Sequence, residues 1–271
     1  MRCTNCTSVN NLSLDTTLRC AEGMIDAPQN GFPYLSISMT EPTSTPLYPL
    51  AAPSQQQVAP AVLPHDPVAE HIATHLGRID TVFHDTIADP VQVDIHVVPA
   101  NERYPFLRLV TSGMSSRPMT VPEGAPPFAE LMMALPADWK LDEQSVQDER
   151  WYWPVALLRH LAHYPHQHAT WLGLGHTVPN GAPAKPYAKG VEFTGAILLP
   201  PASAPDAFAS LERDGQDIYF HCVVPLYEAE LQLVRRKGFP ALLDGFNDKG
   251  VTDLVVPGRK NTVKKFLGLF W

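Results

Sequence analysis

The first regular pattern of hydrophobic and polar positions begins at Asp66-Pro67 and ends at Gly77. Asp66 suits an N-cap because its carboxylate can accept a backbone amide, and Pro67 suits the first helical turn, where no amide hydrogen is needed. The apolar residues between them share one helix face: Val68, Ile72 and Leu76. We therefore predict a helix that starts at Asp66 and stops at Gly77.

Strand patterns follow this helix. Residues 91–98, VQVDIHVV, alternate apolar and polar side chains, which predicts a half-buried strand with its polar face toward solvent. Residues 106–110 predict a second strand, which Ser112-Gly113 ends. The apolar run 128–135 fits a strand or a helix, and the proline that follows it favours a strand.

The second half of the chain continues in the same mixed style. We predict a helix over 153–164, strands over 191–199 and 218–225, a helix over 226–237 and a short strand over 253–256. The buried stripe of the first of these helices is expected to be Trp153, Leu157, Leu158 and Leu161. Because strands and helices do not alternate regularly, we expect an α+β (mixed α/β) fold, one domain with a mixed, largely antiparallel sheet flanked by helices.

The first 64 residues read differently. Residues 40–64 hold six prolines and one charged residue, and the whole of 1–64 is rich in Ser, Thr and Pro. Such a composition favours a disordered segment, so we place the folded domain at 65–271. Cys3, Cys6 and Cys20 resemble half a zinc ribbon, but no second pair completes four ligands, and we expect no metal there.

Charge limits the classes of partner. The chain carries 20 basic and 28 acidic residues, for a formal net charge of -8, which argues against a nucleic-acid binder. The excess lies in residues 65–227, with ten basic and nineteen acidic side chains, and it allows a basic protein partner. No apolar run approaches the roughly 18 residues of a membrane span, and the start resembles no signal peptide. We expect a cytoplasmic protein without membrane contact.

Histidines gather in residues 160–176, which hold five of the eleven in the chain. His160 and His163 share a helix face, and His166 or His168 could turn back toward them, so a metal-dependent hydrolase is the alternative function. No HExxH pattern supplies a general base, however. The other interpretation is a solvated polar face opposite the apolar stripe of the helix, and we assign no metal ligand.

Other chemistry has little support in the sequence. Gly173-Leu174-Gly175 lacks the third glycine and the following helix of a dinucleotide loop. The serines show no G-x-S-x-G signature and no local base, and Cys222 lies on the inner face of a predicted strand. We therefore expect no catalytic residue, no cofactor and no enzymatic activity.

Four blocks resemble a known family, in this order and at these distances. They are residues 82–119 with their TSGMS motif, then ELMMALPADW, then HYPHQHATWLGLGHTVPNG, and finally FTGAILLPP. Together they look like the bacterial suppressor-of-fused domain over roughly residues 65–260. The TSGMS and TWLGLGHTVPNG motifs are the specific parts of this resemblance.

The resemblance implies a non-enzymatic protein-binding module. Animal members sequester transcription factors by clamping an extended peptide as an added strand, with help from a second domain that we expect this chain to lack. Bacterial members are similar to immunity proteins that neutralise a cognate toxin. We therefore expect an immunity-type protein that occludes a toxin domain with a basic surface. The sequence leaves the oligomeric state of the protein open.

The same resemblance marks candidate partner-binding residues. Tyr164 matches a tyrosine that contacts the peptide in animal members, whereas Gly175 stands where those members have Asp. With Tyr164 we group Trp171 and His176 from the specific block. The alternative is that this block is a buried loop, in which glycines permit positive φ and Trp171 fills the core.

Overall fold

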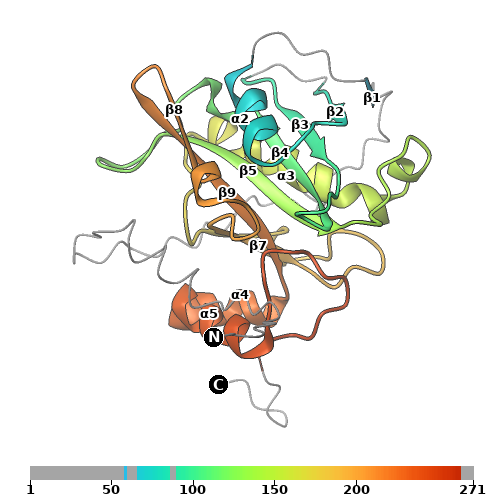
Figure 1. Cartoon of the computed structure of the whole chain (residues 1–271). Coiled ribbons are helices and arrows are strands. Elements are labelled where there is room, and N and C mark those ends of the chain that lie inside the picture. Colours follow the sequence, from blue (N-terminus) through green and yellow to red (C-terminus); the bar gives the residue numbers. More distant parts are fainter. Residues whose placement is uncertain (1–57, 60–65, 86–89, 264–271) are drawn as a thin grey trace, which may run out of the picture. The chain divides into compact units, whose positions relative to one another are not determined.

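The protein is described from a computed structural model that covers residues 58–59, 66–85 and 90–263 (Figure 1). The predicted disordered segment and its three cysteines lie outside these residues, apart from the backbone of Val58–Ala59. The domain boundary at residue 65 therefore stays a prediction.

One mixed sheet runs through the described chain. Its strands follow the order β1-β2-β3-β4-β5-β9-β7-β6, and β8 pairs with β9. The pairing of β5 with β9 is parallel and the others are antiparallel. The strands are β1 (Val58–Ala59), β2 (Thr81–Phe83), β3 (Asp94–Val98), β4 (Phe106–Ser112), β5 (Phe128–Pro136), β6 (Thr177–Pro179), β7 (Gly195–Leu199), β8 (Ser210–Arg213) and β9 (Gln216–Leu226).

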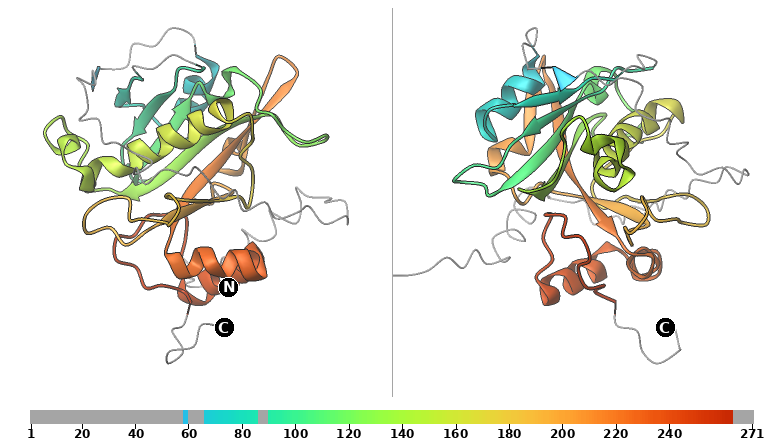
Figure 2. Two further views of the ribbon diagram at one scale, coloured as in Figure 1. Left: turned by 180° about the vertical axis from the view of Figure 1, so that it is seen from behind. Right: turned by 90° about the vertical axis from the view of Figure 1, so that its right-hand side faces the viewer.

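Helices cover both faces of this sheet. The described helices are α2 (Pro67–His75), α3 (Glu149–Gln167), α4 (Glu228–Lys237) and α5 (Phe239–Lys249). Viewed along the sheet, α2 and α3 lie on opposite faces, and α4 and α5 pack together at one end (Figure 2). The predicted fold class, a mixed and largely antiparallel sheet flanked by helices, is confirmed.

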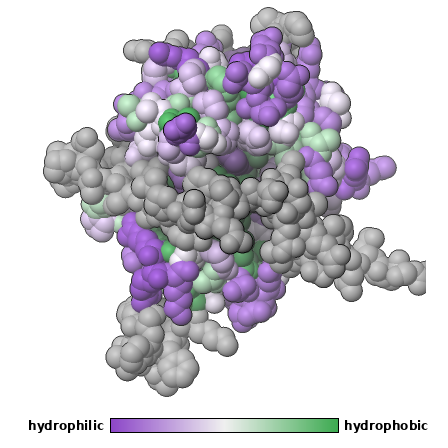
Figure 3. Space-filling view, turned by 90° about the vertical axis from the view of Figure 1, so that its left-hand side faces the viewer, coloured by the Kyte–Doolittle hydropathy of each residue, from purple (hydrophilic) through white to green (hydrophobic). Residues whose placement is uncertain are grey.

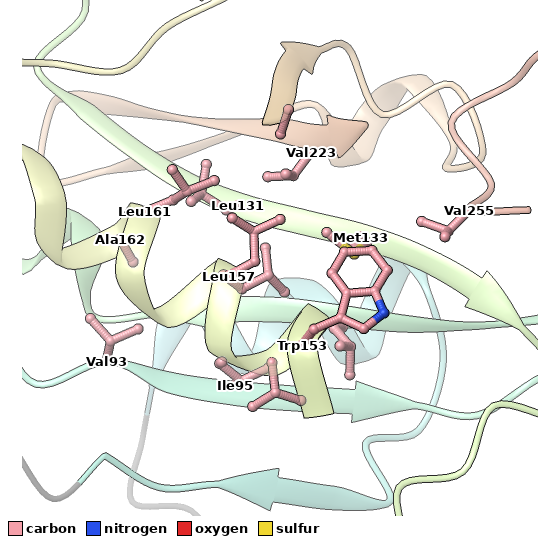
Figure 4. Close-up of a cluster of buried hydrophobic side chains, with 14 of the residues drawn as sticks. Val93, Ile95, Leu131, Met133, Trp153, Leu157, Leu161, Ala162, Val223 and Val255 are labelled. Carbon is pink, nitrogen blue, oxygen red and sulfur yellow. The ribbon is translucent and has the colours of Figure 1, made fainter. Parts of the chain in front are cut away.

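The larger core lies between α3 and the sheet. The predicted stripe of α3 is buried, and it packs against residues of β3 and β5 such as Ile95, Leu131 and Met133 (Figure 4). Asp148 caps the start of the helix, because its carboxylate accepts the amide of Arg150, two residues further on. The helix therefore begins before the predicted residue 153 and runs on to Gln167.

The second core covers the other face. The stripe of α2 (Val68, Ile72 and Leu76) is buried there, together with four alternate residues of β9, which are Ile218, Phe220, Cys222 and Val224. The Asp66 cap and the stop before Gly77 are also as predicted, with Asp66 Oδ1 accepting the Val68 amide at 2.9 Å. Because both faces of the sheet are covered, few of its strands have a face that is exposed to solvent.

This double cover makes one prediction wrong. The strand expected over 91–98 begins at Asp94, and its polar face is only partly in solvent, since Gln92 is exposed and Asp94 is half-buried. His96 is fully buried, because Val98 and Val110 on the same face join the second core. Alternation correctly sorted the side chains between faces, but it could not show that both faces are covered.

Two predicted strands are shorter than expected, and one helix was missed. Residues 188–191 form a turn, closed by the Val191 amide on Ala188, so β7 begins only at Gly195. The strand expected over 253–256 is a single bridge between Leu254 and Ala134. The unpredicted helix is α5, where Pro240 lies in the first turn and does not break the helix.

Candidate functional site

The TWLGLGHTVPNG block forms the end of the sheet at β6. We call residues 171–179 the β6 edge. The β6 strand pairs with β7 through Val178 and Ala196, and the flanking Asn180 amide bonds to Thr194. Because antiparallel pairing alternates, the Thr177 amide and carbonyl point away from β7. Pro179 has no amide hydrogen, so Thr177 carries the one outward amide of β6, although all three residues of this strand are buried in the folded chain.

Two glycines shape the approach to the strand. A Cβ on Gly173 would lie 2.6 Å from Trp171 Cζ3, so this glycine lets the indole pack against the backbone. Gly175 has φ +80° and donates its amide to Leu198, whose own amide bonds to His176. Gly175 and His176 thus both lie opposite Leu198, which makes a β-bulge with its glycine in the left-handed region. The predicted positive φ is found at Gly175.

Of the candidate binding residues, Trp171 and His176 belong to this edge and Tyr164 lies on α3, and all three are more buried than exposed. The rings of Trp171 and His176 meet edge to face, with centroids 4.2 Å apart, so the structure brings these two together. Burial lowers the pKa of His176, and a hydrogen bond to the Trp171 backbone partly opposes that shift. Tyr164 is also buried and its ring lies 4.5 Å from that of His168.

Sequence reasoning missed Leu174, which lies between the two glycines. It is 37% exposed, and among the described residues only Val256 is another exposed large hydrophobic side chain. An exposed apolar side chain beside a sheet edge is a suitable anchor for a partner. Nothing in the local pattern distinguished Leu174 from a core leucine.

The histidine cluster is divided among separate contacts. His163 Nε2 lies 2.5 Å from the Asp85 carboxylate, and His166 Nε2 lies 2.9 Å from the Met114 carbonyl. Burial lowers the pKa of His160 to about 4. The predicted solvated face is wrong for His163, which is 5% exposed, because Asp85 and the chain beside it cover that part of α3.

No metal centre forms from these groups. Within residues 66–85 and 90–263, no three His, Cys, Asp or Glu side chains are arranged to hold a metal ion. His163 and His166 use one nitrogen each on partners from other parts of the chain. The arrangement therefore gives the hydrolase alternative no support.

The other specific motif, TSGMS, wraps around a buried carboxylate. Glu130 of β5 is fully buried and accepts hydrogen bonds from Thr111 Oγ1 at 2.6 Å, the Gly113 amide at 3.0 Å, and both the amide and hydroxyl of Ser115 at 2.9 and 2.7 Å. Burial raises the pKa of Glu130, and these donors oppose the shift. The loop is thus shaped by one side chain.

Membrane insertion through a helix has no candidate in the described chain. Of the helices in residues 66–85 and 90–263, none combines the length and the apolar character needed to cross a bilayer.

Comparison with solved structures shows the same fold. A suppressor of fused homolog from Neisseria gonorrhoeae FA 1090 aligns with a TM-score of 0.51 at 18% identity, covering 74% of this chain and 97% of that one. A chain of the Sufu-Fu complex aligns with a TM-score of 0.50 at 16% identity, covering 72% of this chain and 90% of that one.

Sequence comparison identifies the family. No curated protein sequence matches the chain. The family profile described as Suppressor of fused protein (SUFU) matches residues 89–260, which include the TSGMS loop, α3 and the β6 edge. The chain belongs to the suppressor of fused protein family.

Proposed function

We propose that the protein is a non-enzymatic binding module that takes an extended segment of a partner protein along the β6 edge. The observation that carries this proposal is the outward direction of the Thr177 amide and carbonyl on the last strand of the sheet, a buried strand that is flanked by exposed Leu174. An extended segment that pairs with such an edge gains main-chain hydrogen bonds, and neighbouring side chains supply specificity.

The side chains beside the edge fit this role. Leu174 offers an apolar contact, and Trp171 is partly exposed next to it. The bulge at Gly175 and the packing of Trp171 on Gly173 hold this segment in one shape before binding. A preformed edge lowers the entropy lost when the partner segment is ordered.

The partner we propose is a basic toxin domain, which the protein would occlude in the cytoplasm as an immunity-type protein. The excess of nineteen acidic over ten basic residues in 65–227 supports a basic partner. Complementary charge would speed their association, and the gain would be screened beyond about 8 Å at physiological salt.

A pair of matched variants tests the edge. The full chain is used to capture its partner from the native cell lysate, and the affinity of the identified partner is then measured. Leu174→Asp should weaken binding at least tenfold, roughly the cost of one lost interface anchor. Val256→Asp places the same charge on the other exposed hydrophobic residue and should leave the affinity unchanged. Equal affinities for both variants would rule out the β6 edge.

The toxin role has its own test. The captured partner is expressed alone and together with this chain, and growth is followed. Expression alone should arrest growth, and co-expression should restore it. A partner that is harmless when expressed alone would contradict the immunity role, while leaving the binding edge to the variants above.

A further inference from the structure

We propose that a hollow beside the TSGMS loop binds a lysine or arginine side chain of the partner protein. This inference rests on the proposed function, since it assigns a second contact to that protein partner. The hollow has a volume of about 320 Å³ and lies among the start of α2, the start of β3, the TSGMS loop and the β8–β9 hairpin. It shares no lining residue with the β6 edge.

Two carboxylates line the hollow from different elements. Asp66 comes from the cap of α2, and its Oδ1 accepts the Val68 amide at 2.9 Å. Asp94 begins β3; its Oδ2 lies 3.0 Å from His84 Nδ1, and its Oδ1 accepts the Asp85 amide at 3.2 Å. Among the described residues, neither carboxylate forms an ion pair with a lysine or arginine.

A third carboxylate lies directly behind the wall. Glu130 holds Gly113 and Ser115, both of which line the hollow, and every donor to it is a neutral group. The pKa of Glu130 is raised first by burial, and the nearby Asp66 carboxylate adds to this rise. Three carboxyl groups therefore share this end of the sheet, and the buried one has only neutral donors around it. A concave site lined by the carboxylates of Asp66 and Asp94 attracts a cation.

The protein itself already places one guanidinium in this wall. Arg213 of β8 reaches across the hollow, and its Nη2 donates to the Ser115 carbonyl at 3.2 Å. It forms no ion pair with Asp66 or Asp94, and the one basic side chain that contacts either of them in the described residues is His84, 3.0 Å from Asp94. A guanidinium therefore suits the lining chemically, and acceptors remain for a second cation.

The lining fits a side chain with an apolar stem and a charged head. Val68, which is 2% exposed, supplies a small apolar contact, the two carboxylates supply charge, and the Ser112 hydroxyl is fixed by a 2.8 Å hydrogen bond to His96 Nε2. Lysine and arginine combine such a stem and head. A bare metal ion fits less well, since no three ligand side chains converge in the described residues.

The surroundings would guide a basic partner toward the hollow. The turn of the β8–β9 hairpin carries Glu212, Asp214 and Asp217, all exposed, against the single Arg213. Figure 3 shows that the upper end of one face, at the height of α2 and β8 in Figure 1, is mostly hydrophilic. By contrast, the last turn of α4 at the opposite end is basic, with Arg235, Arg236 and Lys237.

The experiment uses a free cation probe, so that it needs no partner protein. The ¹⁵N-labelled full chain is titrated with Nα-acetyl-L-arginine N-methylamide, and separately with the neutral citrulline analogue. We expect saturable shifts of the Gly113, Ser115 and Ser116 amides with the arginine probe and none with citrulline. Equal responses to the two probes would overturn the proposal.

Matched variants locate the probe. Asp94→Asn and, separately, Asp66→Asn should each weaken binding of the arginine probe about fivefold. This is the effect expected when one of two opposite charges about 4 Å apart in water is removed. Asparagine also keeps the helix cap at residue 66. Asp244→Asn removes an exposed carboxylate from α5, at the far end of the molecule, and should change nothing.

A variant with an added positive charge tests whether misfolding, and not the lost charge, explains weaker probe binding in the aspartate variants. Gln92 is exposed on the rim of the hollow, so Gln92→Lys adds an internal cation without disturbing the core. It should abolish the shifts. Unchanged probe affinity in Gln92→Lys and both aspartate variants would overturn the proposal. Leu174→Asp acts at the β6 edge, away from the hollow. If the probe does not bind the hollow, the result for partner binding at the β6 edge therefore still stands, and a negative result at the β6 edge likewise leaves the probe result standing.

Discussion

Two fully buried glutamates are satisfied in opposite ways. Glu230 of α4 meets a guanidinium, with Arg259 Nη1 2.7 Å from Oε1 and Nη2 2.6 Å from Oε2. Thr262 adds its amide and hydroxyl to the same carboxylate. Glu130 of β5 has neutral donors alone. One glutamate therefore docks the C-terminal segment by charge, while the other shapes the TSGMS loop by hydrogen bonds from neutral donors.

The largest effect is expected where an ion pair is broken. Arg259→Met leaves Glu230 buried without its cation, which should lower the free energy of unfolding by about 3–5 kcal/mol. Arg236→Met, at an exposed position of α4, should stay within about 0.5 kcal/mol of the parent protein. Denaturant unfolding measures both. A loss below about 1 kcal/mol for Arg259→Met would show that the ion pair does not hold this segment.

The next effect tests the loop around Glu130. Gly113 has φ +102°, and a Cβ there would lie 1.9 Å from the Gln92 carbonyl oxygen. Gly113→Ala should therefore cost about 2–4 kcal/mol, from both the clash and the positive φ. Gly124→Ala shares a positive φ of +82° but has open space, so it should cost only about 1 kcal/mol. Similar unfolding energies for the two variants would show that the loop yields to the added methyl group.

The smallest effect separates the two glutamates most clearly. Glu130→Gln orphans no cation, so it should change the free energy of unfolding by no more than about 1 kcal/mol near pH 5. In the parent protein the pKa of Glu130 is raised above 4.5, so the folded state keeps a proton that the unfolded chain releases. This group therefore makes stability fall as pH rises from 4.5 through the raised pKa.

The pH dependence is the measurement for this variant. Thermal unfolding of both proteins is followed from pH 4.5 to pH 8, and Glu130→Gln should gain relative to the parent as pH rises. A difference that stays constant with pH would contradict a raised pKa of Glu130. Asp244→Asn, at an exposed carboxylate, serves as the control.

Local signals explain why much of the fold was predictable. Asp66 and Pro67 specify the start of α2 by their own chemistry, and the apolar stripe of α3 repeats at the helical period. The environment of β3 was not predictable, because the second core that buries His96 comes from α2, β9 and the C-terminal helices. Alternation reports two faces but not what covers them.

The candidate sites were harder to predict from the sequence for the same reason, because they depend on contacts between distant parts of the chain. Glu130 lies in an apolar run, and its partners Thr111 and Ser115 come from a neighbouring strand and the loop after it. Leu174 is exposed directly before the bulge at the end of the sheet, and no local pattern indicates that bulge. The glycines of that block signalled an unusual backbone, but not that it borders a sheet edge.

Hydrogen exchange at the Thr177 amide tests the central claim most directly. Exchange of the full chain is measured with and without its captured partner. If a partner segment adds to the sheet at β6, exchange at Thr177 should slow strongly on binding, because this outward amide gains an acceptor. Unchanged exchange at Thr177, with protection confined to other surfaces, would contradict binding at the β6 edge.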